Sequence, residues 1–300
     1  MTQSTNGKTL LDTINGGSSE HVAIRTTEGQ TITYESLVKH VEYIGKYLVS
    51  IGIKRDDRVG IVIPNSAETI LAFLGVASVA TAAPLNPAYK PDEFKFFLED
   101  TKATAILTGS SGADIAIDAA PECIKRVQLE IDHAGDLKLS SDAKPSHSNY
   151  VTDPQPSDVA LILHTSGTTS RPKMVPLTHY NLTSSIDNII ATYGLSDNDI
   201  SLCIMPLFHV HGLMASTLST LSSGGTVVVP PRFNALQFLR IAEEQQFTWY
   251  TAVPSIHQAL LSRSQNREKE FQIPSLRFIR SCSSALAPST MHSIEEIFQV

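Results

Sequence analysis

Apolar runs of strand length alternate along this sequence with stretches whose apolar residues recur at helical spacing. The run Arg58–Ile63 has the length and composition of a buried strand. Upstream of it, Leu37, Val41 and Ile44 recur at the spacing of one helix face. Because strands and helices alternate in this way, the sequence predicts βαβ units. The expected fold class is α/β, with mainly parallel sheets flanked by helices.

The same patterns divide most of the chain into elements, starting with a hairpin within Val22–Tyr34. Further strands are expected at Arg58–Ile63, Ala83–Leu85, Ala105–Leu107, Asp158–Leu163, Asp199–Met205, Thr226–Val229, Thr248–Val253 and Leu276–Ser281. Helices are expected from Glu35 to about Gly52 and at Asn65–Ala80, Pro91–Leu98, Asn181–Tyr193, Val210–Leu221, Asn234–Gln245, Ser255–Arg263 and Ser289–Val300. Asn65 precedes Glu68 by three residues, which is the spacing of an N-cap pair, and Thr178 is the expected cap of the helix that ends near Gly194.

Two segments lack a core pattern. Residues 1–19 form a polar lead-in, apart from a short apolar patch at Leu10 and Leu11. Residues 138–157 are rich in Ser, Asp, Pro and His, so we expect a surface connector that divides two α/β units. Residues 20–300 are expected to form one domain.

Composition narrows the class of protein. The net charge is −7 and no block of Lys or Arg interrupts it, which argues against a nucleic-acid surface. The three cysteines are far apart, which favours buried thiols in a reducing compartment over disulfides. We find neither an apolar stretch long enough to cross a bilayer nor an apolar signal core. The sequence therefore predicts a soluble intracellular protein, and nothing in it specifies an oligomeric state.

The segment Thr165–Lys173 carries the strongest chemical signal. A buried strand leads into five hydroxyl residues around Gly167, followed by Pro172 and Lys173. Such a loop offers backbone N–H groups and hydroxyls to an anion, and the lysine adds a positive charge. A flexible connector is the alternative reading, but connectors seldom follow a core strand and end in a lysine. The spacing differs from the common G-x-x-x-x-G-K-[ST] loop, so we expect a different kind of nucleotide phosphate loop.

Thr165–Lys173 resembles the phosphate loop of the adenylate-forming acyl-CoA synthetase superfamily. Met205–Gly212 resembles the segment that lines the acyl site in that superfamily, and Arg280–Pro288 the strand and loop beside adenine and acyl groups. Gly60–Tyr89 also follows the family style, and the motifs come in the family's order. Together they are most similar to the oxalate–CoA ligase branch of fungi and plants. The resemblance implies the fold of the large N-terminal domain of acyl-CoA synthetases.

The resemblance also implies a reaction and its cofactors: ATP, Mg²⁺ and coenzyme A. A small-molecule carboxylic acid attacks the α-phosphorus of ATP, pyrophosphate leaves, and the thiol captures the acyl-adenylate. The family's magnesium ligand, ribose-binding acid and catalytic C-terminal lysine would lie beyond Val300, so no metal ligand is assigned here. The chain is therefore expected to be an incomplete AMP-binding domain that is inactive alone. The resemblance is compatible with cytoplasm or peroxisome as its location.

Roles carry over residue by residue. The ATP phosphates are assigned to Thr165, Ser166, Gly167, Thr168, Thr169 and Lys173. The catalytic residues that the resemblance implies are His209 and Lys173. The adenine side is assigned to Ser284, Ala285 and Leu286, and the acyl side to His211, Ser281 and Ser283. Arg171 is expected to be mainly solvated.

The acyl-side assignment depends on strand parity. Period-2 alternation after Leu276 places Ser281 and Ser283 on one face and Arg280 on the other. Arg280 would then supply charge to an acid only if this parity were wrong, which leaves His211, protonated, as the expected cationic partner. His209 and His211 also suggest a zinc pair, but no third ligand lies at a suitable spacing. A structural role remains the alternative for each histidine, and plain turn chemistry for Ser281.

A polar acyl pocket favours a small polar acid, with oxalate first. Three alternatives stay open: a non-catalytic nucleotide-binding module, a 4-coumarate- or fatty-acid-type ligase, and an amino-acid-adenylating domain. The last would want an acidic residue near Phe208–Leu213 to pair with the substrate ammonium, and that segment has none.

Overall fold

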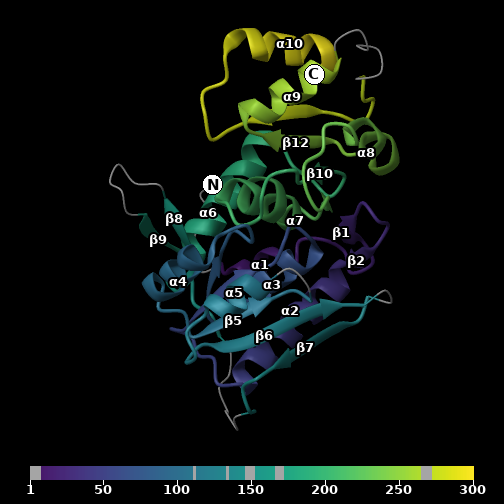
Figure 1. Cartoon of the computed structure of the whole chain (residues 1–300). Coiled ribbons are helices and arrows are strands. Elements are labelled where there is room, and N and C mark those ends of the chain that lie inside the picture. The colour runs from purple at the N-terminus through teal and green to yellow at the C-terminus, as the bar shows by residue number, and fades with distance from the viewer. Residues whose placement is uncertain (1–7, 111–112, 133–134, 146–152, 166–171, 265–271) are drawn as a thin grey trace.

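Two mainly parallel sheets and three helical layers make up the protein in a computed structural model (Figure 1). The structure describes residues 8–110, 113–132, 135–145, 153–165, 172–264 and 272–300. The seven-stranded sheet has the order β7 (Leu137–Ser141), β6 (Lys125–Ile131), β5 (Ala105–Thr108), β3 (Arg58–Val62), β4 (Thr81–Pro84), β8 (Val159–Thr165) and β9 (Lys173–Thr178). The six-stranded sheet has the order β13 (Phe278–Ser281), β12 (Trp249–Ala252), β10 (Ile200–Leu202), β11 (Thr226–Val229), β1 (Val22–Thr26) and β2 (Thr31–Thr33).

The helices connect and cover these strands. They are α1 (Leu10–Thr13), α2 (Tyr34–Ser50), α3 (Ala67–Ala77), α4 (Pro91–Asp100), α5 (Asp114–Ala119), α6 (His179–Tyr193), the π-helix η1 (His211–Leu218), α7 (Ser219–Ser222), α8 (Phe238–Gln245), α9 (Pro254–Ser264) and α10 (Pro288–Phe298). The expected α/β class with mainly parallel sheets is confirmed. No helix in the described ranges combines the length and the apolar character needed to cross a membrane.

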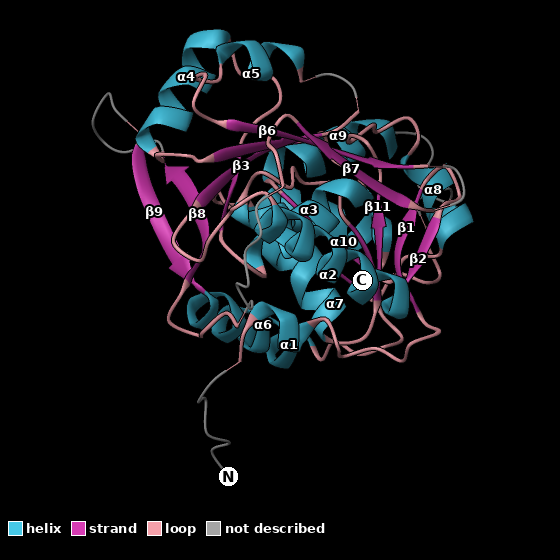
Figure 2. Cartoon of the chain, turned by 90° about the horizontal axis from the view of Figure 1, so that it is seen from below, coloured by secondary structure: helices cyan, strands magenta, loops and turns pink. Residues whose placement is uncertain are grey.

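Alternating side chains on the strands define the layers. On β5, Ala105 and Leu107 join the central core that contains α2 and α3, whereas Ile106 packs with α4 and α5 on the outer face. On β11, Val227 joins the central core, and Val228 packs with α8, α9 and α10 on the far side. Figure 2 shows α4 and α5 beyond β6 and β3, with α2 and α3 in the middle of the molecule. Both sheets are therefore covered on both faces, which explains their near-continuous apolar strands.

The chain crosses between the sheets twice, which corrects the expected two-unit division. β8 and β9 follow the predicted connector but join the first sheet, and β1 and β2 precede it but pair with the second. The predicted connector at residues 138–157 also begins inside β7, which pairs antiparallel with β6. The predicted polar lead-in contributes to the core, because Leu10 is fully buried and its N–H donates to His179 Nδ1 at 3.1 Å.

Helix α6 begins at the cap that the sequence predicts. The Asn181 N–H donates to Thr178 Oγ1 at 3.1 Å, and the Thr178 N–H donates to Asn181 Oδ1 at 3.0 Å. Gly194 ends the helix in the left-handed conformation, with φ at 58°. This cap fixes the point where the hairpin formed by β8 and β9 passes into a helix.

Removing the cap hydroxyl should weaken this junction. We expect Thr178→Ala to lower the free energy of unfolding by about 1 kcal/mol, because it leaves a helix N–H without its acceptor. Urea denaturation measures the effect, and Thr178→Ser is the matched control that keeps the hydroxyl. Equal stability of the alanine and serine variants would show that the cap is not what holds this helix end.

Candidate active site

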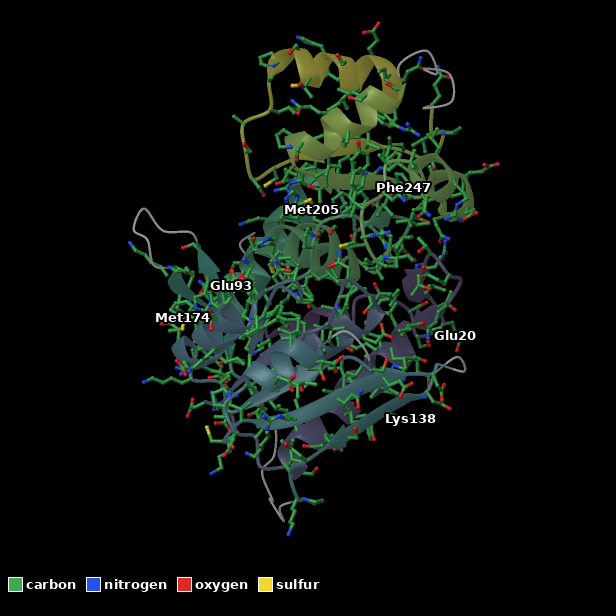
Figure 3. The ribbon with its side chains drawn as sticks, in the orientation of Figure 1. Glu20, Glu93, Lys138, Met174, Met205 and Phe247 are labelled. Atoms are coloured by element: carbon green, nitrogen blue, oxygen red, sulfur yellow. The ribbon has the colours of Figure 1, made fainter. Side chains whose placement is uncertain are left out.

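The predicted phosphate loop is closed by an antiparallel hairpin. Thr165, the last residue of β8, pairs with Lys173, the first residue of β9. Both are exposed, and Met174 beside Lys173 lies at the outer edge of the molecule, whereas Met205 lies near its centre (Figure 3). The other predicted phosphate ligands, Ser166, Gly167, Thr168 and Thr169, and also Arg171, lie outside the described residues.

A histidine that sequence reasoning missed holds the start of this hairpin loop. His164 Nε2 lies 3.0 Å from Asp100 Oδ2 at the end of α4, and the His164 ring packs edge-on against Phe97 at 4.7 Å. The strand end that leads into Thr165 is therefore tied to α4. No local sequence motif joins His164 to a residue 64 positions away.

The Met205–Gly212 segment is held by Asn65, which is not the helix cap that the sequence predicted. Ser66 occupies the N-cap position of α3 instead. Asn65 Nδ2 donates to the Met205 carbonyl at 3.0 Å, and the Leu207 N–H donates to Asn65 Oδ1 at 2.9 Å. One amide side chain thus matches a donor and an acceptor on a segment 140 residues away, and in this way it positions the histidines that follow.

The two histidines of that segment have different environments. His209 is exposed, and its ring lies 4.6 Å from that of Phe208. His211 is only 5% exposed and begins η1, so the pair does not alternate on a strand. The Gly212 carbonyl accepts from both Ser216 Oγ and Thr217 Oγ1 at 2.9 Å, which suits the wider π-helical turn.

His211 is the centre of a polar group at the ends of β12 and β13, here called the His211 cluster (His211, Thr251, Arg280 and Ser283). His211 Nε2 lies 2.7 Å from Thr251 Oγ1, and His211 Nδ1 lies 2.9 Å from Ser283 Oγ. Arg280 Nη1 donates to the same Thr251 oxygen at 3.1 Å. One guanidinium and three neutral polar side chains therefore converge at this edge of the sheet.

The cluster corrects the predicted strand parity. Arg280, and not Ser281, shares the face of His211, because Arg280 and Thr251 are register partners on neighbouring strands. Ser283 reaches the same face because its φ is +70°, which interrupts the period-2 alternation. Ser281 lines a cavity of about 380 Å³ on the other face with His257 and Ile294, and its buried Oγ has no hydrogen-bond partner among the described residues. The sequence-predicted acyl set is thus only partly brought together.

Charge in the cluster resides on Arg280. Burial is the largest cause that lowers the pKa of His211 to about 4, and the positive charge of Arg280 contributes in the same direction. His211 is therefore neutral near neutral pH, which corrects the expectation of a protonated imidazole. Partial desolvation by neighbouring atoms also lowers the pKa of His209, although its side chain is exposed. The cation of this cluster is therefore the guanidinium.

The buried histidines predict a pH-dependent stability. Burial lowers the pKa of His179 to about 4, as it does for His211. The unfolded chain takes up protons first as the pH falls below about 6.5, so the free energy of unfolding should decrease from about pH 7 towards pH 4. Each histidine can contribute up to about 3 kcal/mol to this loss. Urea denaturation across this range should show a shallower decline for His179→Gln than for wild type, with His292→Gln as the exposed control. Equal slopes in all three proteins would contradict the assignment.

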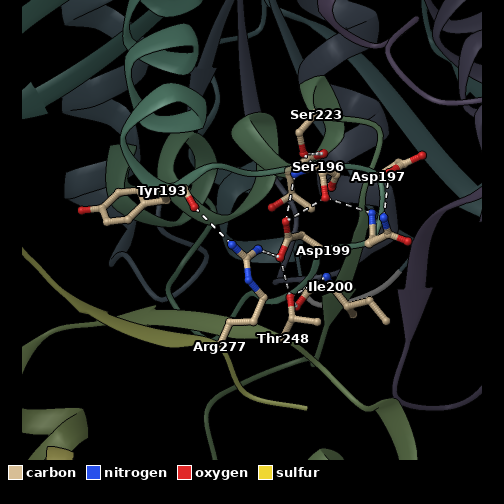
Figure 4. A network of polar contacts seen from close by, with 10 residues as sticks. Tyr193, Ser196, Asp197, Asp199, Ile200, Ser223, Thr248 and Arg277 are labelled. Carbon is tan, nitrogen blue, oxygen red and sulfur yellow. Dashed lines mark hydrogen bonds and ion pairs between the residues drawn. The ribbon is translucent and has the colours of Figure 1, made fainter. Parts of the chain in front are cut away.

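A network of polar contacts around the buried Asp199 fixes the opposite ends of the same strands (Figure 4). Asp199 is 1% exposed and pairs with Arg277, which precedes β13. Thr248 Oγ1 donates to Asp199 Oδ1 at 2.9 Å, and Arg277 Nη2 donates to the Tyr193 carbonyl at 3.4 Å. The starts of β10, β12 and β13 and the end of α6 are therefore joined. The Arg280 Nε–H donates to the Tyr193 hydroxyl at 3.1 Å.

The predicted adenine-side residues follow directly after the cluster. Ser284 and Ala285 are exposed, and the side chain of Leu286 packs against the core that contains α9 and α10. In the described part of the chain, no three His, Cys, Asp or Glu side chains gather in a way that could hold a metal ion.

The amino-acid sequence is similar to a known enzyme family and to several known ligases. The AMP-binding enzyme family matches residues 12–300. An oxalate–CoA ligase of Arabidopsis thaliana is 42% identical over 96% of this chain and 58% of its own length, and one of Saccharomyces cerevisiae is 38% identical over 93% and 57%. A probable CoA ligase of Humulus lupulus, CCL9, is 40% identical over 93% of this chain and 55% of its own length.

Solved structures share the fold. The crystal structure of ATP-bound MatB from Rhodopseudomonas palustris superposes with a TM-score of 0.81 and 24% identity, over 97% of this chain and 58% of that chain. The chain spans little more than half the length of these relatives. Because the family match covers almost the whole sequence, this chain belongs to the AMP-binding enzyme family.

Proposed function

We propose that the protein acts as an ATP-dependent acid–CoA ligase on a small dicarboxylic acid, with oxalate as the first candidate. The observation that carries the substrate class is the His211 cluster, in which Arg280 is the cation beside neutral His211 and Thr251. A second carboxylate in a closed pocket is costly unless its charge is met and its oxygens are hydrogen-bonded. The cluster offers a positive charge on Arg280 and polar groups that can form hydrogen bonds. The oxalate–CoA ligases among the relatives support the same choice.

Different residues of the chain position the substrates and neutralise their charges. ATP, when bound, supplies the adenylyl group and pyrophosphate as the leaving group. Lys173 is exposed at the hairpin end and forms no ion pair with a described residue, so its charge is available to a phosphate. His209 is assigned to the wall beside the reacting carboxylate, and Arg280 to the distal carboxylate. Transfers of this kind depend chiefly on positioning and electrostatics. No residue of this chain is proposed as a magnesium ligand, and coenzyme A is proposed as the accepting thiol.

A substrate panel tests the function. The longest protein that the gene encodes is assayed for acid-dependent ATP–pyrophosphate exchange with oxalate, malonate, acetate, a medium-chain fatty acid and a cinnamate. We expect oxalate to give the highest kcat/KM. Preference for the fatty acid or the cinnamate would contradict the polar pocket but leave adenylation standing. Absence of exchange with every acid would point to a non-catalytic nucleotide-binding protein.

The 300-residue chain alone provides the matched comparison. It contains the phosphate-loop hairpin and the His211 cluster but corresponds to little more than half of its relatives. We expect it to show no acyl-CoA formation under conditions in which the longest form is active. Robust ligase turnover by the 300-residue chain would contradict its assignment as a part of the catalytic unit.

A further inference from the structure

Tyr193, the last residue of α6, lies against the face of β13 that carries Arg280. Its ring stacks on Phe278 with centroids 5.2 Å apart and planes 7° apart. Its hydroxyl accepts the Arg280 Nε–H at 3.1 Å, and its carbonyl accepts from Arg277. Tyr193 thus contacts three residues of one short segment through its ring, its hydroxyl and its backbone.

The tyrosine ring is itself held in place. Phe278 stacks on its other neighbour, Trp249, with centroids 5.1 Å apart, and Trp249 is fully buried. Arg277, which donates to the Tyr193 carbonyl, is paired with the buried Asp199. The Tyr193 hydroxyl is therefore a fixed acceptor, whereas an arginine side chain on its own samples many rotamers.

Two hydrogen bonds on different nitrogens determine where the Arg280 guanidinium points. Tyr193 accepts from Nε, and Thr251 accepts from Nη1. The remaining nitrogen of Arg280, Nη2, forms no hydrogen bond with a described residue. A planar guanidinium that is held at two of its nitrogens presents its remaining N–H groups in a set direction, as recognition of a carboxylate requires.

We propose that Tyr193 is a positioning residue that sets acid specificity by orienting Arg280 towards the distal carboxylate of the substrate. This inference rests on the proposed function and adds the specificity determinant. Tyr193 needs no contact with the acid, because it acts through the guanidinium. A monocarboxylic acid has no distal carboxylate, so its use does not depend on this orientation.

The test removes only the hydroxyl, in the longest protein that the gene encodes. Tyr193→Phe keeps the ring that stacks on Phe278. We expect the KM for oxalate to rise about 10-fold, the effect of one hydrogen bond to a charged group. The KM values for ATP and acetate and the thermal midpoint should stay at their wild-type values. Tyr180→Phe is the matched control, because Tyr180 lies at the other end of α6 and is 45% exposed.

A double-mutant cycle assigns the effect to Arg280. If Tyr193 acts through the guanidinium, Tyr193→Phe should change the KM for oxalate less than twofold in an Arg280→Gln background. An equal 10-fold effect in both backgrounds would overturn the inference.

Two further outcomes separate this inference from the proposed function. A Tyr193→Phe enzyme that prefers oxalate and binds it as wild type does would overturn the role of Tyr193 and leave the function intact. A parallel rise in the KM values for oxalate, acetate and ATP would show a merely structural role and would also overturn it. A wild-type enzyme that prefers acetate would overturn both.

Discussion

Replacing Lys173 by alanine should weaken the use of ATP by about 10- to 150-fold, which corresponds to the loss of one charge-assisted contact of about 1.5–3 kcal/mol. Lys173 is exposed and lies at the end of a hairpin, so its side chain contributes little to core packing. The free energy of unfolding should therefore stay close to that of wild type. ATP–pyrophosphate exchange at varied ATP measures the effect in the longest protein that the gene encodes.

The control for this experiment is another exposed lysine. Lys95 lies on the solvent side of α4, and Lys95→Ala should behave as wild type. Lys173→Arg retains the charge with a different donor geometry and should lose less activity than alanine. If exchange by Lys173→Ala stays within about twofold of wild type, this end of the hairpin does not hold phosphate.

Replacing Arg280 by methionine should separate dicarboxylic from monocarboxylic acids. The methionine keeps most of the side-chain volume but removes the cation, so the distal carboxylate of oxalate would enter the His211 cluster without a counter-charge. We expect kcat/KM for oxalate to fall about 100-fold and that for acetate to change by less than about fivefold, from the cost of leaving one charge unpaired. Pyrophosphate release with each acid is the measurement.

Two comparisons sharpen this result. Arg240→Met removes an exposed arginine on α8 that pairs with Glu244, and it should leave both activities unchanged. His211→Gln should reduce oxalate use less than Arg280→Met does, because His211 is neutral in the folded protein. Equal losses for oxalate and acetate in Arg280→Met would mean that the arginine holds the strand and not the substrate.

The spacing of apolar residues along the sequence was sufficient to predict most of the strands and helices. The pattern at Thr226–Val229 gave a buried strand, and the pattern before Gly194 gave α6 with its cap. Elements with weak patterns were missed. β9 is an exposed edge strand that contains Pro176, so neither an apolar run nor strong alternation marks it. α1 is a single turn whose burial depends on contacts with α6.

The site was less predictable because its features depend on tertiary contacts. The positive φ of Ser283 changes which face its side chain reaches, and no period-2 argument anticipates that. The neutral state of His211 follows from burial and from the charge of Arg280, neither of which is visible along the sequence. Asn65 resembled a helix cap locally, but its amide satisfies backbone groups of a distant segment.

The pairing of β1 with β11 has a consequence for synthesis on the ribosome. Ile24 on β1 is the register partner of Val227 on β11. Pairing between these two strands can therefore form only after about 200 further residues have been translated. At roughly 5–20 residues per second this takes about 10–40 s. During that time β1 can pair only with β2, and its other edge, which joins β11 in the folded protein, is open. Ala23 and Ile24 of β1 are fully buried in the folded protein. The nascent protein therefore passes through a prolonged stage in which a chaperone, or early packing against α2, must shield this hairpin from aggregation.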